Sequence, residues 1–356
     1  MRLGIVLHDF ALGGTERIAV RLAEAWARAG AEVEIFCGSE AGPIRSLVAR
    51  SVRVVEADPP IPRRIGSRKR LGVAAASYFR DRRFDGIFIP GNFHWPLIAP
   101  LGKIVQNRRP RLVAQISSAL RKAGRRGFRQ HFFEARSRRR LAGADAIVAL
   151  SEQAASQARA MFGKPVHVIR LPVLPDESPT LVMVPGGDPL VVAAGRFVEQ
   201  KDFTTLVEAF ALVRHSNVSL AIVGDGPQRN RVTQRIRELG LGRRVTLPGY
   251  VDDIRPWLDR ARVFALSSRH EGYGAVIVEA LAAGRPVVAT DCTPAATELL
   301  GDGEAGLAVP IADPAALAGA LDAMLDRPPP DPIAIARRVE PWKIGPIAEQ
   351  YLDLFE

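Results

Sequence analysis

The chain has only two cysteines, Cys37 and Cys292, among 356 residues, and they lie far apart. Their number and spacing argue against a disulfide framework and against a cysteine zinc site, and they favour a reducing compartment. No apolar run reaches the roughly 18 residues that a membrane-spanning helix needs. Segment 1–9 meets a polar residue too early for a secretory signal, so we expect a cytoplasmic protein.

Internal repeats and low-complexity tracts are also lacking. Apolar residues make up 47% and charged residues 24% of the chain, which is ordinary globular composition and argues against wholesale disorder. A chain of this length exceeds one hydrophobic core and predicts two domains of roughly 170 residues each.

Positive charge is concentrated in the first half of the chain. Residues 1–180 hold 31 lysines and arginines against 15 acidic residues, whereas the remainder holds 18 against 23, and the whole chain carries +11. This asymmetry favours an anionic surface or substrate for the first half. An arginine-rich composition without functional meaning is the alternative.

Apolar runs followed by glycine-containing loops and helical periodicity recur along the chain. A helix is expected over 16–29, where Ile18, Leu22 and Trp26 share one face. Continuous apolar runs are typical of parallel strands covered on both sides, so the repeated pattern predicts α/β domains with doubly wound sheets. The strands expected in the first half are 3–7, 33–37, 86–89, 112–116 and 146–150.

A proline-rich stretch, 172–189, predicts a linker, after which the pattern restarts. We therefore expect domains over 1–172 and 173–340. The tail 341–356 is expected to form an amphipathic helix that returns to the first domain. Strands of the second half are expected at 190–195, 220–224, 245–247, 263–266 and 287–290.

The strongest constellation runs from Glu271 to Asp291. Glu271 follows a strand, and Gly272 and Gly274 allow a ligand to approach the backbone. A helix beginning near Gly274 offers free amides and a positive dipole end, which suit a phosphate. Glu279 lies on this helix. By themselves, the two carboxylates could equally be a cap and a solvated helix residue.

A second constellation comprises Gly195, Arg196 and Lys201, between a strand and a helix over 204–213. A guanidinium and an ammonium five residues apart can bracket a diphosphate and stabilise it as a leaving group. A solvated pair of basic residues is the alternative.

These blocks resemble the Glu-x7-Glu and Gly-Arg-x4-Lys motifs of retaining family-4 glycosyltransferases (glycosyl transferases group 1). The resemblance implies the GT-B architecture, in which two Rossmann-like doubly wound domains face each other across a cleft. It implies that Glu271, Arg196 and Lys201 are catalytic, that Arg196 and Lys201 hold the diphosphate, and that Glu279 binds the donor ribose. Further donor contacts are implied, in chain order, for Gly13, Gly14, Gly195, Gly224, Tyr250, Val251, Gly272, Tyr273 and Gly274.

One departure concerns the strand over 112–116. Many relatives carry a histidine after it, whereas this chain has Ser117 and Ser118. Either serine could fill that space. His94 could face the acceptor, although a loop histidine packed beside an aromatic residue is the commoner arrangement.

The resemblance implies retaining transfer of a hexosyl unit from a nucleoside-diphosphate sugar to a lipid-linked or cell-envelope saccharide. A UDP-sugar is favoured, with GDP-mannose as the second choice. We expect no cofactor and no metal, and the chain has no Asp-x-Asp pair. A sugar-nucleotide epimerase of the same fold, or a non-enzymatic protein that binds anionic surfaces or nucleic acid, remains an alternative.

The arginines of the first half, interleaved with Phe79, Phe128, Phe132 and Phe133, predict peripheral association with an anionic membrane at the inner face of the plasma membrane. No nucleic-acid partner is expected, because zinc spacings, helix-turn-helix features and aromatic RNA-binding motifs are lacking.

Overall fold

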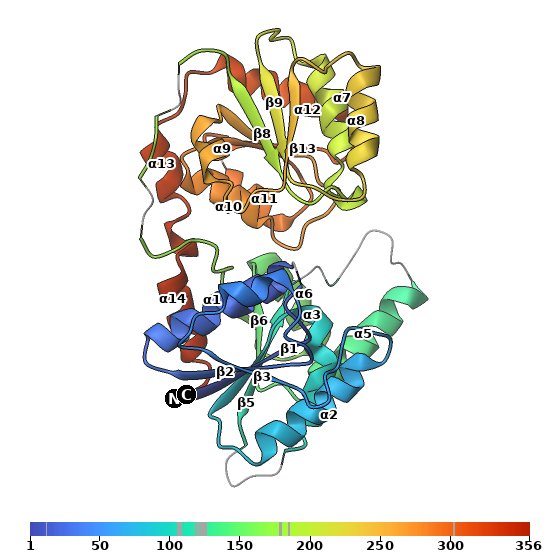
Figure 1. Ribbon diagram of the computed structural model, residues 1–356, viewed down its shortest axis with the longest axis vertical. Coiled ribbons are helices and arrows are strands. Elements are labelled where there is room, and N and C mark those ends of the chain that lie inside the picture. The colour runs from blue at the N-terminus through green and yellow to red at the C-terminus, as the bar shows by residue number, and fades with distance from the viewer. Residues whose placement is uncertain are drawn as a thin grey trace. The chain divides into compact units, whose positions relative to one another are not determined.

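The computed structural model describes residues 1–11, 13–104, 109–117, 120, 127–177, 180–183, 186–301 and 303–356. The chain divides into two compact units (Figure 1). Unit 1 comprises Met1–Val173 together with Lys343–Glu356, and unit 2 comprises Leu174–Trp342.

Unit 1 is built on a seven-stranded sheet in the order β3-β2-β1-β4-β5-β6-β7, and all its pairs are parallel. Its strands are β1 (Arg2–Leu7), β2 (Glu32–Cys37), β3 (Arg53–Glu56), β4 (Gly86–Ile89), β5 (Arg111–Ile116), β6 (Ala146–Ala149) and β7 (His167–Val168). Its helices are α1 (Gly14–Arg28), α2 (Ser67–Arg80), α3 (Gly91–His94), α4 (Ile98–Leu101), α5 (Phe128–Leu141), α6 (Glu152–Phe162) and α14 (Ile344–Leu352), with short 3-10 turns η1 (Pro43–Leu47) and η2 (Trp95–Leu97).

Unit 2 has a six-stranded parallel sheet in the order β10-β9-β8-β11-β12-β13. Its strands are β8 (Leu190–Ala194), β9 (Ser219–Val223), β10 (Val245–Gly249), β11 (Val263–Leu266), β12 (Val287–Thr290) and β13 (Gly306–Val309). Its helices are α7 (Phe203–Leu212), α8 (Arg229–Glu238), α9 (Arg255–Arg260), α10 (Ala275–Ala282), α11 (Pro294–Leu300), α12 (Pro314–Asp326) and α13 (Pro332–Arg337), with turns η3 (Glu199–Lys201) and η4 (Glu340–Trp342).

The predicted α/β class with doubly wound sheets is confirmed. The central strands are buried along their whole length, as β4 and β11 show, which explains their uninterrupted apolar sequences. Three strands were not predicted. Strand β3 is a half-buried edge strand, β7 has two residues, and β13 begins with glycine, so none of them carries a long apolar run.

The C-terminal helix α14 is part of unit 1 because the core of that unit extends onto it. The fully buried Trp26 of α1 donates from Nε1 to the carbonyl of Ala348 at 3.0 Å and contacts Tyr351 and Phe355 edge-on. A Cβ atom at Gly86 would lie 2.0 Å from Phe355, so only glycine leaves room for this ring. Such contacts contribute through apolar burial and ring geometry.

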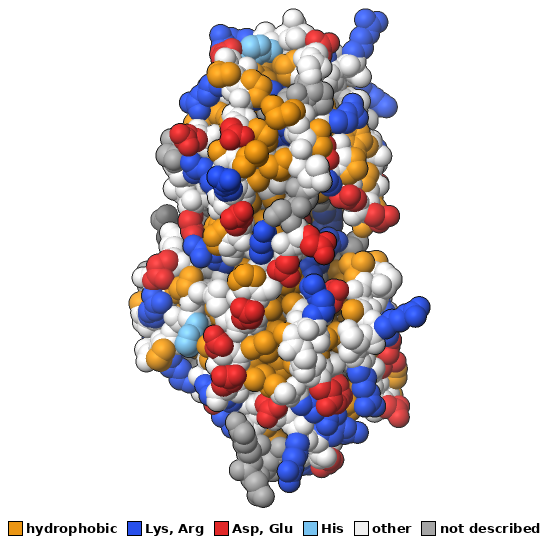
Figure 2. Space-filling model, turned by 90° about the vertical axis from the view of Figure 1, so that its left-hand side faces the viewer, with side chains coloured by type: hydrophobic (Ala, Val, Ile, Leu, Met, Phe, Trp, Pro, Cys, Tyr) orange, Lys and Arg blue, Asp and Glu red, His pale blue; other side chains and the backbone are white. Residues whose placement is uncertain are grey.

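Two of the four phenylalanines expected on the basic surface of unit 1 pack inward, because Phe79 is buried and Phe133 is partly buried against the core. Phe79 is 0% exposed and packs from α2 against Gly4 of β1, so it cannot contact a membrane. Phe128 and Phe132 of α5 are exposed, at 84% and 60%. Figure 2 shows the side of unit 1 that carries α14, where acidic and basic side chains are mixed.

Candidate functional site

The candidate site of unit 2 lies at the point where the strand order of its sheet reverses. Strands β8 and β11 are neighbours, although β9 and β10 intervene in the chain. The connections that leave the carboxyl ends of β8 and β11 run to opposite sides, and this opens a crevice where α/β sheets bind ligands. The loop after β8 begins with Gly195, and the loop after β11 begins with Ser267.

Two glycines allow the loops after β8 and β9 to touch. Gly224 has φ +133°, and a Cβ atom there would lie 2.0 Å from the carbonyl oxygen of Gly195. Gly195 has φ +152°, and its own Cβ would lie 2.9 Å from Cε of Lys201. Neither position tolerates a side chain. The predicted donor-binding residue Arg196 follows, and it is exposed at this edge of the sheet.

Lys201 is held by a short irregular segment before α7. It ends the turn η3, and Asp202 then adopts a left-handed conformation with φ 47°. Arg269 fixes this segment to the loop after β11, because its Nε donates to Asp202 Oδ2 at 2.8 Å and its amide donates to the Gln200 carbonyl at 2.8 Å. The two loops therefore form one hydrogen-bonded body.

The structure brings Lys201 and Glu271 into direct contact. The Lys201 ammonium lies 2.7 Å from Glu271 Oε1, and the two side chains are 17% and 10% exposed. Ser268 donates a hydrogen bond to the same oxygen at 2.6 Å. Charges that are mostly withdrawn from water attract each other more strongly than a surface pair does. The pair thus fixes a cation and a carboxylate at the crevice.

The remaining motif residues begin α10. Gly274 has φ +86° and is the N-cap of this helix, with no side chain capping its free amides, so these amides remain available to an anion. Gly272 is exposed, and Glu279 lies in the second turn of the helix. Tyr273 is buried, and its hydroxyl accepts a hydrogen bond from Trp342. Its ring is thus part of the core, and only its backbone can serve a ligand.

The segment after β10 lies at the same edge of the sheet. Gly249 accepts a hydrogen bond from the amide of Gly224 at 2.8 Å, and Tyr250 is 59% exposed beside the partly buried Val251. Arg229 of α8 donates to the Leu247 carbonyl at 2.8 Å and thereby holds this segment. The donor-contact roles of Gly224, Tyr250 and Val251 stay predictions.

In unit 1, Gly13 and Gly14 form the start of α1. Gly13 is the N-cap in extended conformation, and Gly14 has open space around it. A Cβ atom at Gly13 would lie 2.2 Å from Oε2 of Glu16, so this carboxylate folds back over the helix start. Acidic groups are favoured at this positive helix end. The role of the two glycines in donor binding stays a prediction.

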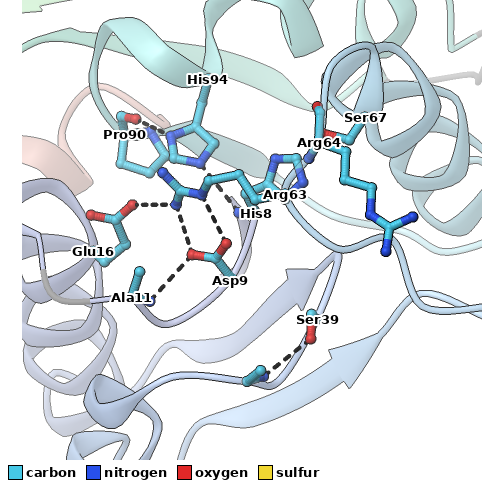
Figure 3. Close-up of polar contacts among 11 residues, drawn as sticks. His8, Asp9, Ala11, Glu16, Ser39, Arg63, Arg64, Ser67, Pro90 and His94 are labelled. Atoms are coloured by element: carbon cyan, nitrogen blue, oxygen red, sulfur yellow. Dashed lines mark hydrogen bonds and ion pairs between the residues drawn. The ribbon is translucent and has the colours of Figure 1, made fainter.

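A polar cluster surrounds this helix start (Figure 3). Arg63 binds both carboxylate oxygens of Asp9, with distances of 2.8 and 2.7 Å, and also Glu16 at 3.0 Å. Burial acts to raise the pKa of Asp9, but the hydrogen bonds from Arg63 and from the Ala11 amide outweigh it and leave the pKa lowered. Asp9 is therefore a poor general base.

His94 is a buried structural residue. Its Nδ1 lies 2.7 Å from the Pro90 carbonyl, and its Nε2 accepts a hydrogen bond from the His8 amide at 3.2 Å. Full burial lowers its pKa to about 4, so the ring is neutral at pH 7. The structure thus shows the commoner of the two arrangements, a histidine packed beside an aromatic residue. Ser117, at the position of the missing histidine, exchanges hydrogen bonds with Asn92, and Ser118 lies outside the described residues.

The chemistry of other reactive groups is limited. Burial, as the largest cause, raises the pKa of the Cys292 thiol to about 11 and that of the Cys37 thiol to about 12, so both stay protonated. Among the described residues, no helix is long and apolar enough to cross a membrane, and no group of three potential metal ligands occurs.

Sequence reasoning missed three parts of the arrangement. Ser267 and Ser268 carry no motif of their own, and only the bonds they make after β11 reveal them. The ion pairs of Arg63 join residues 47 and 54 positions apart, which no local pattern indicates. The buried state of Tyr273 depends on Trp342, which lies 69 residues away.

Comparisons with known proteins agree with this architecture. A family model described as Glycosyltransferase Family 4 matches residues 12–177, and one described as Glycosyl transferases group 1 matches residues 188–327. The lipopolysaccharide core biosynthesis glycosyltransferase LpsE of Rhizobium meliloti is 42% identical over 138 residues, which are 39% of this chain and 40% of LpsE. The chain thus matches less than half the length of this relative.

Solved structures match over the whole chain. HepE of Anabaena in complex with UDP has a TM-score of 0.79 at 18% identity, and the apo form of the lipopolysaccharide outer core galactosyltransferase WaaB has 0.76 at 17%, each covering 99% of both chains. The expected GT-B fold is confirmed. The chain belongs to the glycosyltransferases that combine a Glycosyltransferase Family 4 domain with a Glycosyl transferases group 1 domain.

Proposed function

We propose that this protein is a retaining glycosyltransferase that moves a hexosyl unit from a nucleoside-diphosphate sugar to a hydroxyl of a lipid-linked or cell-envelope saccharide. The observation that carries the proposal is the Lys201–Glu271 pair at the switch point of unit 2, with a separation of 2.7 Å. This pair sets a cation beside a carboxylate, and we propose that the cation binds the leaving phosphate and the carboxylate binds sugar hydroxyls.

The roles follow from the charges at the site. Arg196 and Lys201 bind the diphosphate, and the free amides at the start of α10 add positive potential where charge develops in the transition state. Glu271 and the amides of residues 272–274 orient the transferred sugar, and Glu279 binds the ribose hydroxyls. A fixed positive site that is formed before the reaction lowers the barrier without reorganisation at the moment of bond cleavage.

The reaction we propose breaks the bond between the anomeric carbon and the diphosphate oxygen. The acceptor oxygen bonds to that carbon on the same face, and its proton passes to the leaving diphosphate oxygen. Atoms and charge then balance with no further reactant. Neither metal nor cofactor takes part in the proposed reaction, because Arg196, Lys201 and the helix amides supply the positive charge.

Names of similar proteins support the substrate classes. LpsE is named for lipopolysaccharide core biosynthesis, and HepE was solved with UDP and with UDP-glucose. We therefore propose a UDP-sugar as the donor, with GDP-mannose as the second choice, and an envelope saccharide as the acceptor.

We also propose that unit 1 rests on an anionic membrane at the inner face of the plasma membrane. Helix α2 carries four basic residues and no acidic one, and α5 carries five arginines and one glutamate. Exposed apolar side chains accompany them, with Ile65, Val73, Phe128 and Phe132 at 106%, 59%, 84% and 60%. Each near-surface charge contributes about 1 kcal/mol, and the rings add apolar insertion.

A panel of UDP-, GDP- and ADP-sugars tests the enzymatic proposal. Ligand-observed NMR identifies the donor that binds, and NMR of the product with a lipopolysaccharide core acceptor gives the anomeric configuration. Transfer with retained configuration supports the proposal, and inverted configuration contradicts retention. Conversion of the donor sugar without an acceptor would show an epimerase, and lack of binding by every donor would refute the assignment.

Cosedimentation with phosphatidylglycerol vesicles at rising salt tests the membrane proposal. We expect salt-sensitive binding that weakens when Phe128 and Phe132 are both replaced by serine. Replacing Leu212, an exposed apolar residue of unit 2, by serine is the control and leaves binding unchanged. Equal binding by neutral phosphatidylcholine vesicles would contradict the electrostatic argument.

A further inference from the structure

Two serines follow β11, and each touches one of the proposed catalytic residues. Both Ser267 and Ser268 are 0% exposed, and buried hydroxyls need hydrogen-bond partners. Ser267 donates from Oγ to the backbone carbonyl of Lys201 at 2.9 Å, and Ser268 donates from Oγ to Oε1 of Glu271 at 2.6 Å. Neither role is implied by the motifs that identified the site.

Ser268 is itself firmly placed. Thr290, at the end of β12, donates from Oγ1 to the carbonyl of Ser268 at 2.6 Å. The backbone amide of Glu271 donates to the carbonyl of Cys292 at 3.0 Å. The backbones of Ser268 and Glu271 are thus both hydrogen-bonded to the neighbouring strand β12 and the residues after it.

The hydrogen bonds to the Glu271 carboxylate reach only one of its two oxygens. In the part of the chain that the structure describes, its side-chain hydrogen bonds come from Lys201 and Ser268, and both reach Oε1. Oε2 therefore keeps its acceptor capacity for a hydroxyl of the substrate. Arrangements that fix the reacting group before substrate arrives increase the rate, because less freedom is lost in the transition state.

We expect donor binding to change this balance. A diphosphate carries more negative charge than one carboxylate and attracts the Lys201 ammonium. When Lys201 turns toward it, the Ser268 hydroxyl remains as the donor that holds Oε1. A hydroxyl costs little to reorient and does not compete for the diphosphate charge.

We propose that Ser268 is a positioning residue, which holds Oε1 of Glu271 so that Oε2 faces the transferred sugar while Lys201 binds the diphosphate. The proposal rests on the function proposed above. Ser268 acts through Glu271 alone, so it affects the chemical step and the sugar, not the nucleotide.

The test is a double-mutant cycle of Ser268→Ala and Glu271→Ala, with the donor and acceptor that the panel identifies. A hydrogen bond to a charged group contributes enough to change a rate about 10-fold or more. We expect Ser268→Ala to lower kcat about 10-fold in the wild-type background and to have no effect in the Glu271→Ala background. The affinity for the nucleoside diphosphate of that donor is expected to be unchanged.

Ser267→Ala is the matched control, since it removes an equally buried hydroxyl at the next position but bonds the Lys201 backbone. Its effect should be the same in both backgrounds. Ser268→Cys keeps the packing but supplies only a weak donor, so it should lose nearly as much kcat as Ser268→Ala with a wild-type unfolding midpoint. This second variant separates positioning from folding.

Three results would overturn the proposal. Wild-type kcat in Ser268→Ala, an equal loss in the Glu271→Ala background, or a parallel loss of affinity for the nucleoside diphosphate each shows that Ser268 does not act through Glu271. In these cases the wild type still transfers sugar, so the proposed function stands. Failure of the wild type to transfer from any donor would remove both.

Discussion

Replacing Lys201 by alanine removes the cation that lies 2.7 Å from Oε1 of Glu271. Deleting one partner of a fully buried pair costs about 3–5 kcal/mol, because the other charge is left uncompensated. Here the side chains of Lys201 and Glu271 are 17% and 10% exposed, and Ser268 still donates a hydrogen bond to Glu271. We therefore expect a loss of about 1–2 kcal/mol in the free energy of unfolding. The melting temperature of unit 2 should fall by about 2–8 °C.

The effect on catalysis is expected to be larger. Removing one donor aimed at a developing negative charge lowers kcat about 10²–10³-fold, or about 3–4 kcal/mol. Steady-state kinetics with the identified donor and acceptor measure this change, and differential scanning calorimetry measures the melting temperature. The kinetic loss should therefore exceed the stability loss, because the negative charge that Lys201 is proposed to stabilise grows as the donor bond breaks.

Arg235→Ala is the matched control. It removes a cation of the same unit that pairs with Glu208 and Glu238 on and beside α8, with Arg235 34% exposed. Exposed pairs contribute about 0–1 kcal/mol, so kcat should stay within about twofold of wild type. A Lys201→Ala variant with nearly wild-type kcat, or an equal loss in Arg235→Ala, would refute the assignment of Lys201 to the leaving group.

Three further outcomes follow from the site and its surroundings. Gly224→Ala should lower the free energy of unfolding of unit 2 by about 3 kcal/mol or more, as measured in denaturant titrations. The cause is that φ is +133° and that the added Cβ would lie 2.0 Å from the Gly195 carbonyl oxygen. Gly319→Ala is the control and should not destabilise unit 2, because a Cβ there meets open space. His94 has its pKa lowered from 6.5 to about 4, so the unfolded chain binds more protons between these values. The His94 contribution to stability is therefore complete above pH 6.5 and falls by up to about 3 kcal/mol as the pH drops toward 4. His94→Gln should flatten the dependence of the free energy of unfolding on pH in this range. An unchanged pH dependence would contradict the assignment of a lowered pKa to His94. In the proposed reaction Arg196, Lys201 and the α10 amides supply the positive charge, so transfer should proceed unchanged in EDTA. Loss of activity that Mg²⁺ or Mn²⁺ restores would show that a metal takes part.

The amino-acid sequence by itself determined the local structure. Apolar runs gave the central strands, and the periodicity of Ile18, Leu22 and Trp26 gave the buried face of α1, because both depend on spacing within one element. The expected strands 190–195 and 220–224 each end in a glycine that the structure instead gives a positive φ angle after the strand, at Gly195 and Gly224. The short strands β3 and β13 were not predicted, since their sequences lack a long apolar run.

Only the tertiary structure decided what these elements bring together. Lys201 and Glu271 lie 70 residues apart and meet because β8 and β11 pair across the sheet. Strand order depends on how helices pack on both faces of the sheet, and no short segment encodes it. The hydrogen bond of Ser268, the ion pairs of Arg63 and the burial of Tyr273 depend on the same long-range packing, which turns separate motifs into a candidate site.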